Sequence, residues 1–191
     1  LQAIKPTDFS RYQRLLKLLK DESYGWDRKA EDDRIVIFTE RVDTMEYLYE
    51  HLAKDLKLKA KEIAKISGAM SDEEQQQIVE NFGRDKADVR ILVASDVASE
   101  GLNLHYLCHR LIHFDLPWSL MVFQQRNGRI DRYGQKQQPD IRYFEEQTEN
   151  EKIHGDLRLL EILVEKEEQA LKNIGDPATL LGVYSEEEEE Q

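Results

Sequence analysis

The chain has 191 residues, of which 40% are hydrophobic and 35% charged, and its formal net charge is −12. This length and composition predict one compact domain with a hydrophobic core and some peripheral helices. We expect a soluble protein, because no apolar run approaches the roughly 20 residues of a membrane span, and the amino-terminal residues lack the basic-then-apolar order of a signal peptide.

Cysteine content and charge distribution narrow the class further. Cys108 is the only cysteine, so neither a disulfide framework nor a cysteine-cluster zinc site can form within the chain. We therefore expect a cytoplasmic protein. Residues 145–191 hold 15 Asp/Glu and 4 Lys/Arg, a net charge of −11, whereas the remaining residues hold 24 and 23, a net of −1. The acidity is a property of the carboxyl-terminal segment and does not argue against nucleic-acid binding by the rest.

The first predicted element is an amphipathic helix over Thr7–Lys20, with Thr7 as the candidate cap. A charged loop follows over Asp21–Asp33. Arg34–Thr39 (RIVIFT) is a short apolar, β-branched run, typical of a buried parallel strand. Asp43–Leu56 has apolar residues along one helical stripe, which predicts a second amphipathic helix.

The alternation of strands and helices continues toward residue 144. Lys61–Ser67 is the next predicted strand, and Ser71 with Glu74 forms a capping box that opens a helix through Phe82. The later predicted strands are Arg90–Ser95, Arg110–Phe114 and Asp140–Phe144. Repeated strand-helix-strand units predict an α/β fold, an open parallel sheet with helices on both faces.

Beyond residue 150 the pattern changes. Lys152–Asn173 is predicted as a carboxyl-terminal amphipathic helix, ended by Gly175-Asp176-Pro177. We therefore divide the chain into a domain at 1–150, a peripheral helical extension at 151–184 and an acidic tail at 185–191. The tail, SEEEEEQ, is a run of like charges that we expect to be disordered; a solvated tail or linker and a partner site are the two alternatives for it.

Two polar stretches follow predicted strands. Asp96–Asn103 follows one strand, and a turn near Asp115 leads into Gln124–Gln135 (QQRNGRIDRYGQ). In open parallel sheets, ligands bind at the carboxyl ends of the strands. The second stretch contains Arg126, Arg129 and Arg132. On a helix, their spacing would place three guanidinium groups close to one face, an arrangement that suits phosphate oxygens; a solvated basic helix is the alternative.

Several segments resemble the superfamily-two helicases and translocases. Gln125, Gly128, Arg129 and Arg132 fill the pattern of motif VI in register. Ile91–Leu104 (ILVASDVASEGLNL) resembles motif V, and Arg34–Thr39 resembles motif IV. The branch-specific segments are Tyr133-Gly134-Gln135 and Leu111–Trp118, in which Trp118 is expected to pack at the rim. They narrow the resemblance to the SWI/SNF-like ATPases, and within these to the bacterial RNA-polymerase-associated type.

This resemblance implies a RecA-like fold and a part in ATP hydrolysis. Arg129 and Arg132 are implied as arginine fingers, the side chains that stabilise negative charge on the transferred phosphoryl group. The implied nucleotide-binding residues are Gln125, Gly128, Gly101 and Asn103. The implied nucleic-acid contacts are Thr39, Ser95 and Ser99. A helix-capping hydroxyl is the alternative for Thr39, and turn chemistry is the alternative for the motif V residues.

Two departures and two absences refine the hypothesis. Glu100 and Asn103 stand where the DEAD-box form of motif V has Arg and Asp. The glutamate argues against DEAD-box RNA unwinding and agrees better with the SWI/SNF-like branch. No GxxxxGK[ST] loop and no acidic box are present. In this family a preceding RecA-like domain supplies both, so ATP and Mg²⁺ would be bound mainly there. His105 and His109 are four residues apart, but no third ligand is evident, and no metal-binding residue is predicted.

The resemblance thus implies the second RecA-like domain of an ATP-dependent translocase on nucleic acid, with duplex DNA as the expected substrate. Its implied partners are the amino-terminal RecA-like domain of the same protein and RNA polymerase or another remodelled protein. The isolated chain is expected to be inactive. Two alternatives are a strand-separating DNA or RNA helicase, and a non-catalytic interaction domain that kept the fold and uses its acidic end to bind basic partners.

Overall fold

The computed structural model describes residues 5–96, 103–144, 161–162 and 165. The chain divides into two units, Leu1–Glu145 and Glu146–Gln191, and the fold given below is that of the first. In the second unit, Glu161, Ile162 and Glu165 are helical; the rest of the predicted carboxyl-terminal helix and the acidic tail lie outside the described residues. In the described part of the chain, no helix is both long enough and apolar enough to cross a membrane.

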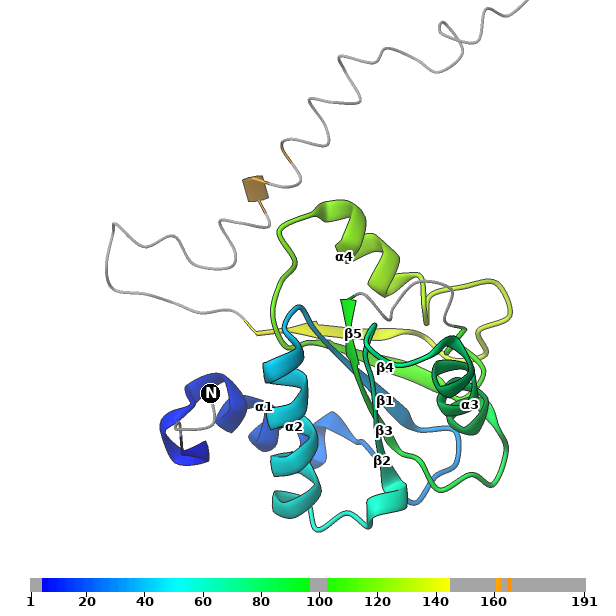
Figure 1. Ribbon diagram of the computed structural model, residues 1–191, viewed down its shortest axis with the longest axis horizontal. Helices are drawn as coiled ribbons and strands as arrows, with labels where there is room; N and C mark the ends of the chain where they lie inside the picture. The colour runs from blue at the N-terminus through cyan, green and yellow to red at the C-terminus, as the bar shows by residue number, and fades with distance from the viewer. Residues whose placement is uncertain (1–4, 97–102, 145–160, 163–164, 166–191) are drawn as a thin grey trace, which may run out of the picture. The chain divides into compact units, whose positions relative to one another are not determined.

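A five-stranded sheet forms the centre of the first unit, with the order β2-β3-β1-β4-β5 (Figure 1). Its strands are β1 Arg34–Thr39, β2 Ile63–Ile66, β3 Ile91–Ser95, β4 Cys108–His113 and β5 Asp140–Tyr143. All four strand pairings are parallel. Every residue of the central strand β1 is buried, as expected for a parallel strand covered on both faces. The predicted open parallel sheet is confirmed.

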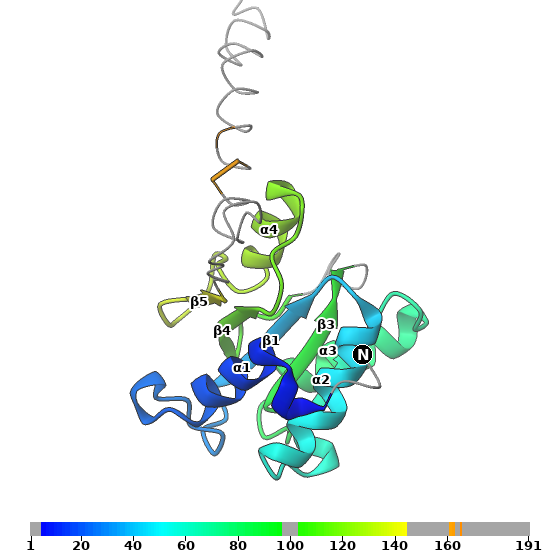
Figure 2. The same cartoon turned by 90° about the vertical axis from the view of Figure 1, so that its left-hand side faces the viewer.

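The helices lie on both faces of this sheet. Its α-helices are α1 Ser10–Lys20, α2 Val42–Asp55, α3 Asp72–Gly83 and α4 Leu120–Asn127. Three short 3₁₀ helices are η1 Pro6–Asp8, η2 Glu22–Tyr24 and η3 Ala60–Glu62. In Figures 1 and 2, α1 and α2 lie on the face opposite to α3. The arrangement is the RecA-like one that the resemblance implied.

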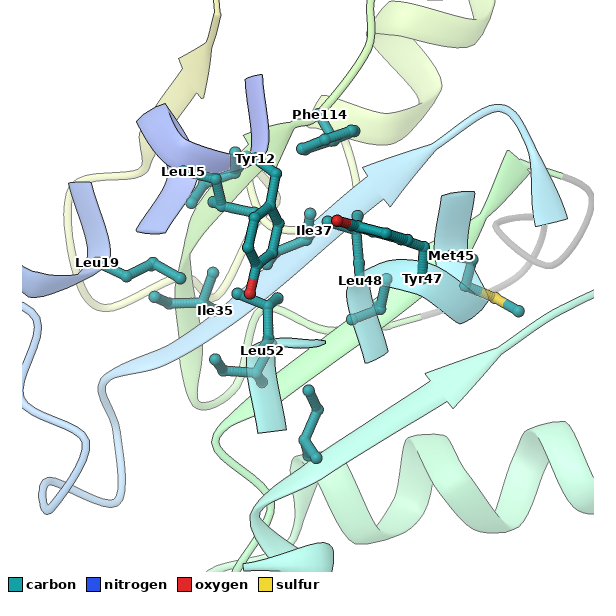
Figure 3. Packing of buried hydrophobic residues seen from close by; sticks show 14 of the residues in the cluster. Tyr12, Leu15, Leu19, Ile35, Ile37, Met45, Tyr47, Leu48, Leu52 and Phe114 are labelled. Atoms are coloured by element: carbon teal, nitrogen blue, oxygen red, sulfur yellow. The ribbon is translucent and has the colours of Figure 1, made fainter. Parts of the chain in front are cut away.

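One hydrophobic core lies between the sheet and the helices α1 and α2. Figure 3 shows Tyr12 and Leu15 of α1 near Leu48 of α2, over Ile35 and Ile37 of β1. All five side chains are fully buried. Ile35 and Ile37 alternate with the other residues of β1 because successive side chains of a strand point to opposite faces.

The second core lies on the other face, between the sheet and α3. Val36 and Phe38 of β1 pack here with Phe82 of α3 and with Ile130 from the segment after α4. Because Ile130 is fully buried, it anchors the arginine-containing segment to the domain. Removing such a side chain from a core typically costs a few kcal/mol.

A buried arginine closes the end of α3. Arg34 at the start of β1 is fully buried, and its guanidinium donates to the carbonyl oxygens of Phe82, of Arg84 at 2.8 Å and of Asn81 at 3.4 Å. Its Nε donates to the carbonyl of Glu31 at 2.8 Å. The carbonyls of Asn81 and Phe82 belong to the last turn of α3 and have no partner within the helix, so the cation satisfies them and complements the helix dipole.

The observed first residues of α1 and α3 can be compared with the two predicted amino-terminal caps, Thr7 and Ser71. The capping box of Ser71 and Glu74 is confirmed: the Ser71 hydroxyl accepts from the Glu74 amide, and the Glu74 carboxylate accepts from the Ser71 amide at 2.9 Å. The Thr7 cap is wrong. Pro6 begins the separate helix η1, α1 starts three residues after Thr7, and the Thr7 hydroxyl donates to Asp8 instead.

Candidate nucleotide and nucleic-acid site

Three strand ends meet at the carboxyl edge of the sheet. In the β1–β3 pairing Thr39 lies beside Ser95, and in the β1–β4 pairing Phe38 lies beside His113. The chain runs on from these strands into Asp96 after β3 and toward Asp115 after β4. This edge therefore gathers polar groups that are distant in sequence, as expected of a parallel sheet.

Arg126, in the last turn of α4, makes hydrogen bonds to several of the polar groups at this edge. Its side chain is 0% exposed. Nε and Nη2 donate to the two carboxylate oxygens of Asp96 at 2.5 and 2.7 Å. Nη1 donates to the backbone carbonyl of Asp115 at 2.9 Å and lies 3.3 Å from Nδ1 of His113. A planar guanidinium suits this set, because it can present donors in several fixed directions at once.

His113 is the neutral member of this cluster. Its Nε2 lies 2.8 Å from the Asn127 side-chain oxygen, so Nε2 carries the hydrogen and Nδ1 accepts from Arg126. Burial, with a smaller contribution from the nearby Arg126 cation, lowers the pKa of His113 to about 4, against a raising effect of the Asn127 hydrogen bond. The ring stacks on Phe123, with centroids 4.4 Å apart. His113 thereby fixes the position of α4 against β4.

Asp115 joins the end of β1 to the same cluster. Its carboxylate accepts from the Thr39 hydroxyl at 2.5 Å and from the Glu40 amide at 2.8 Å. One of its oxygens also lies 3.5 Å from Nη2 of Arg126. The carboxylates of Asp96 and Asp115 therefore both lie within ion-pair distance of one buried cation.

The three arginines do not share a helix face, so that prediction is wrong. Helix α4 ends at Asn127, and Arg129 and Arg132 lie in the turns that follow. Gly128, the carboxyl-terminal cap, and the anchored Ile130 turn the chain away from the helix axis. As a result Arg126 is buried, Arg129 is half-buried and Arg132 is exposed.

Arg132 and Asn103 come together although they are far apart in sequence. Nη1 of Arg132 donates to the side-chain oxygen of Asn103, and both residues are exposed. The backbone follows the same path, since the Leu104 amide donates to the carbonyl of Arg129 at 3.2 Å. The structure thus brings the end of the predicted motif V stretch against the predicted motif VI stretch, with Arg132 at the surface.

The other predicted site residues fall into different positions. Gln125 is exposed on α4, and Gly128 has an ordinary right-handed backbone conformation. Thr39 and Ser95 are buried, so a direct phosphate contact by either hydroxyl requires it to become accessible. The helix-cap alternative for Thr39 is wrong, because Arg41 is the cap residue of α2. The Ser99 and Gly101 predictions lie outside the described residues.

The segment after Arg132 is held by Gln135 and shaped by Gly134. The Gln135 amide group donates to the carbonyls of Cys108 and Ile130, both at 3.0 Å. Gly134 has φ +96°, and a Cβ there would lie 3.5 Å from Nε2 of the buried His105. These contacts give physical reasons for glycine and glutamine at the two positions.

Trp118 and the pair of His105 and His109 lie in surroundings that the sequence did not predict. Trp118 is 74% exposed and lines a pocket of about 500 Å³ with Arg41 and Val42, so the prediction that it packs at the rim is wrong. His105 lies in a turn and His109 lies in β4, so the two do not share a helix face. Among the described residues, no group of three or more metal-binding side chains occurs.

Sequence reasoning missed the partners of Arg126. Asp96, His113 and Asp115 were not among the predicted site residues, and Arg126 itself had no fixed role in the motif pattern. A usable signal was present: an aspartate directly follows β3, and another lies just beyond β4. The carboxyl ends of parallel strands lie at one edge of the sheet, so acidic residues that follow β3 and β4 come close to one another, and largely buried carboxylates need a cation.

Comparisons with known proteins show the family of the chain. A family profile described as "Helicase conserved C-terminal domain" matches residues 10–134. The chain is 28% identical over 160 residues to the "Uncharacterized ATP-dependent helicase YqhH" of Bacillus subtilis, covering 84% of this chain and 27% of that protein. It is 28% identical over 114 residues to the "RNA polymerase-associated protein RapA" of Vibrio campbellii, covering 60% of this chain and 11% of that protein.

A solved structure shows the same fold. The crystal structure of the carboxyl-terminal part of the Fun30 ATPase domain matches with a TM-score of 0.60 and 22% identity, over 75% of this chain and 43% of that chain. The chain spans about a quarter of the length of one curated relative and about a tenth of the other. In each comparison, the similarity therefore concerns one part of a larger polypeptide.

Proposed function

The chain belongs to the helicase conserved C-terminal domain family, and from this we infer that it is the second RecA-like domain of an ATP-dependent translocase on duplex DNA. The observation that carries the proposal is the difference between two arginines of one segment. The side chain of Arg126 is buried and bound within the domain, whereas that of Arg132 is exposed beside Asn103. An exposed guanidinium is available to a phosphate brought by another domain.

The triphosphate itself needs groups that this sequence does not have. It contains no P-loop and no acidic box for Mg²⁺, and it spans only part of its curated relatives. We infer that an amino-terminal RecA-like domain binds most of ATP and Mg²⁺. ATP supplies the phosphoryl group, and Arg129 and Arg132 stabilise negative charge on it as arginine fingers. Gln125, Gly128, Gly101 and Asn103 are the proposed nucleotide contacts. The isolated chain should therefore hydrolyse ATP negligibly.

The nucleic-acid part of the proposal concerns the carboxyl edge of the sheet. Thr39 and Ser95 are the last residues of β1 and β3, and Ser99 follows β3 in the sequence. We propose that these residues follow the phosphate backbone without reading sequence. Duplex DNA is the proposed substrate because the motif V and motif VI stretches resemble those of the SWI/SNF-like ATPases and because Glu100 departs from the DEAD-box form. The name of the similar protein RapA supports RNA polymerase as a candidate for the remodelled partner.

Arg132→Ala in the full-length protein tests the role of the exposed arginine. We expect ATP turnover to fall by on the order of 10³, because a charge needed mainly in the transition state is lost. Arg132→Lys should restore little, since an ammonium does not reproduce the guanidinium fork. The melting temperature should hardly change, because the side chain is exposed and leaves no buried partner behind.

Two outcomes would contradict the proposal. If Arg132→Ala kept wild-type turnover while it lowered the melting temperature of the domain, Arg132 would be a structural residue. If the unmodified full-length protein did not hydrolyse ATP faster in the presence of duplex DNA, the translocase assignment would be wrong. A strand-displacement assay on the same preparation separates a translocase from a helicase, because only the latter releases a free strand.

A further inference from the structure

The contacts of Arg126 connect three segments at the carboxyl edge of the sheet, and they indicate a role for this residue that differs from that of the arginine fingers. We propose that Arg126 is a positioning residue that couples nucleic-acid binding at the ends of β1 and β3 to the placement of Arg129 and Arg132. The proposal rests on the function proposed above. Asp96 is the second positioning residue, because its carboxylate accepts hydrogen bonds from two of the guanidinium nitrogens of Arg126.

The Arg126 guanidinium contacts the segments after β3 and β4 directly and is linked to the end of β1 through Asp115. It binds Asp96 after β3 through the carboxylate, and the loop after β4 through the carbonyl of Asp115. Asp115 in turn accepts from Thr39 at the end of β1 and from the amide of Glu40. A displacement of either proposed nucleic-acid loop is therefore transmitted to Arg126 through charged or charge-assisted hydrogen bonds, which are the strong ones.

The backbone carries a displacement of Arg126 onward to the fingers. The Arg129 amide donates to the carbonyl of Arg126 at 3.1 Å, and Arg132 lies three residues further on. Asp96 binds Arg126, and Asn103 binds Arg132. The two ends of the Asp96–Asn103 stretch are thus held by two arginines of one seven-residue segment.

Arg34 shows what a purely structural buried arginine looks like in this domain. It is as fully buried as Arg126, but the hydrogen bonds described for it go to backbone carbonyls around the end of α3 and the turn before β1. No contact of Arg34 with Asp96, Asp115 or Asn103 occurs among those described. Replacing Arg34 therefore removes a buried cation of the same kind without touching the loops at the carboxyl edge.

The test measures ATP turnover per folded molecule of the full-length protein, with and without saturating duplex DNA. In Arg126→Met and in Asp96→Asn, we expect the ratio of DNA-stimulated to basal turnover to fall by about tenfold, the usual scale of coupling between two sites. Arg34→Met is the matched control. It should lower the melting temperature at least as much, but it should keep the wild-type ratio.

Lysine provides a second comparison. Arg126→Lys keeps the charge but cannot bind both oxygens of Asp96 together with the Asp115 carbonyl, so the ratio should stay low. If Arg126→Met does not fold, Asp96→Asn alone decides the matter, since Asp96 is only partly buried.

An unchanged ratio in the variant of Arg126 or of Asp96 would overturn the proposal, and so would an equal loss in Arg34→Met, which would indicate general destabilisation. These results are distinct from failure of the proposed function. In that case the unmodified protein itself would show no stimulation by DNA. The inference alone fails when the unmodified protein is stimulated and the Arg126 variants are stimulated equally well.

Discussion

Arg126 and Asp96 form a bidentate ion pair, with Nε and Nη2 of the arginine 2.5 and 2.7 Å from the two carboxylate oxygens. The arginine is fully buried and the aspartate side chain is 20% exposed. Removing a charge from water is costly, and its attraction to a partner offsets this cost only when the geometry is good and the remaining donors are satisfied. Here the carbonyl of Asp115 and Nδ1 of His113 complete the set of acceptors.

A double-mutant cycle should show that this pair is strongly coupled. Arg126→Met leaves a carboxylate without its buried partner, and Asp96→Asn leaves a buried cation with a weaker one, so each should lower the unfolding free energy by about 3 kcal/mol. The double variant should cost less than the sum, by about 1–3 kcal/mol. Urea denaturation at neutral pH provides the measurement.

The exposed ion pair of Lys61 and Asp88, 2.9 Å apart, is the control for this cycle. Solvent screens an exposed pair, so its two single variants should be additive within error. Additive costs at Asp96 and Arg126 as well would show that each side chain acts alone.

His113 should make the domain lose stability as the pH falls below neutrality. Its folded-state pKa is lowered to about 4, so the unfolded chain binds a proton near pH 6.5 while the folded chain remains neutral. The contribution is complete above the unfolded pKa and is lost as the pH falls from about 6.5 to about 4, up to about 3 kcal/mol. The neighbouring Arg126 cation opposes protonation in the folded state throughout this range.

The measurement is urea denaturation of unmodified protein and His113→Gln at about pH 7 and about pH 5. Glutamine keeps a polar side chain but does not titrate, so the variant should lose less stability between the two pH values. Carboxylates titrate in both proteins and cancel in the comparison. An identical pH dependence would mean that His113 is protonated as easily in the folded as in the unfolded chain.

Gly134 and Gly25 should respond differently to substitution by asparagine. Gly25 has φ +67° and open space around it, whereas Gly134 has φ +96° and the His105 ring beside it. Asparagine tolerates the left-handed region near +60°, so Gly25→Asn should change the unfolding free energy little. Gly134→Asn should cost about 1–2 kcal/mol, because a φ of +96° lies outside the left-handed region that asparagine tolerates and would strain the new residue. Equal melting temperatures for the two variants would contradict this reading of Gly134.

Local chemistry determined much of the fold in advance. The apolar run of β1 was predicted with its observed bounds, since a strand covered on both faces needs apolar side chains at nearly every position. The capping box of Ser71 and Glu74 was also identified, because its two hydrogen bonds join residues three apart. Thr7 failed as a cap for an equally local reason: Pro6 begins a short helix of its own.

The roles of the three arginines are where sequence reasoning stopped. Their equal spacing predicts the same surroundings for all three, yet Arg126 is buried, Arg129 is half-buried and Arg132 is exposed. What separates them is the end of α4 at Asn127 and the burial of Ile130 in the second core. Neither follows from the spacing of charges, because a helix of suitable periodicity ends wherever packing turns the chain away from it.

The sequence by itself determined the alternation of strands and helices and the resemblance to the helicase C-terminal domains, because both depend on residues close together along the chain. Only the tertiary structure decided which arginine is buried and paired with acidic residues inside the domain. Arg126 is neutralised by Asp96, 30 positions earlier, and by the groups around Asp115, 11 positions earlier. Those acceptors meet because parallel strands bring their carboxyl ends to one edge, and a cation can be buried only where such acceptors converge.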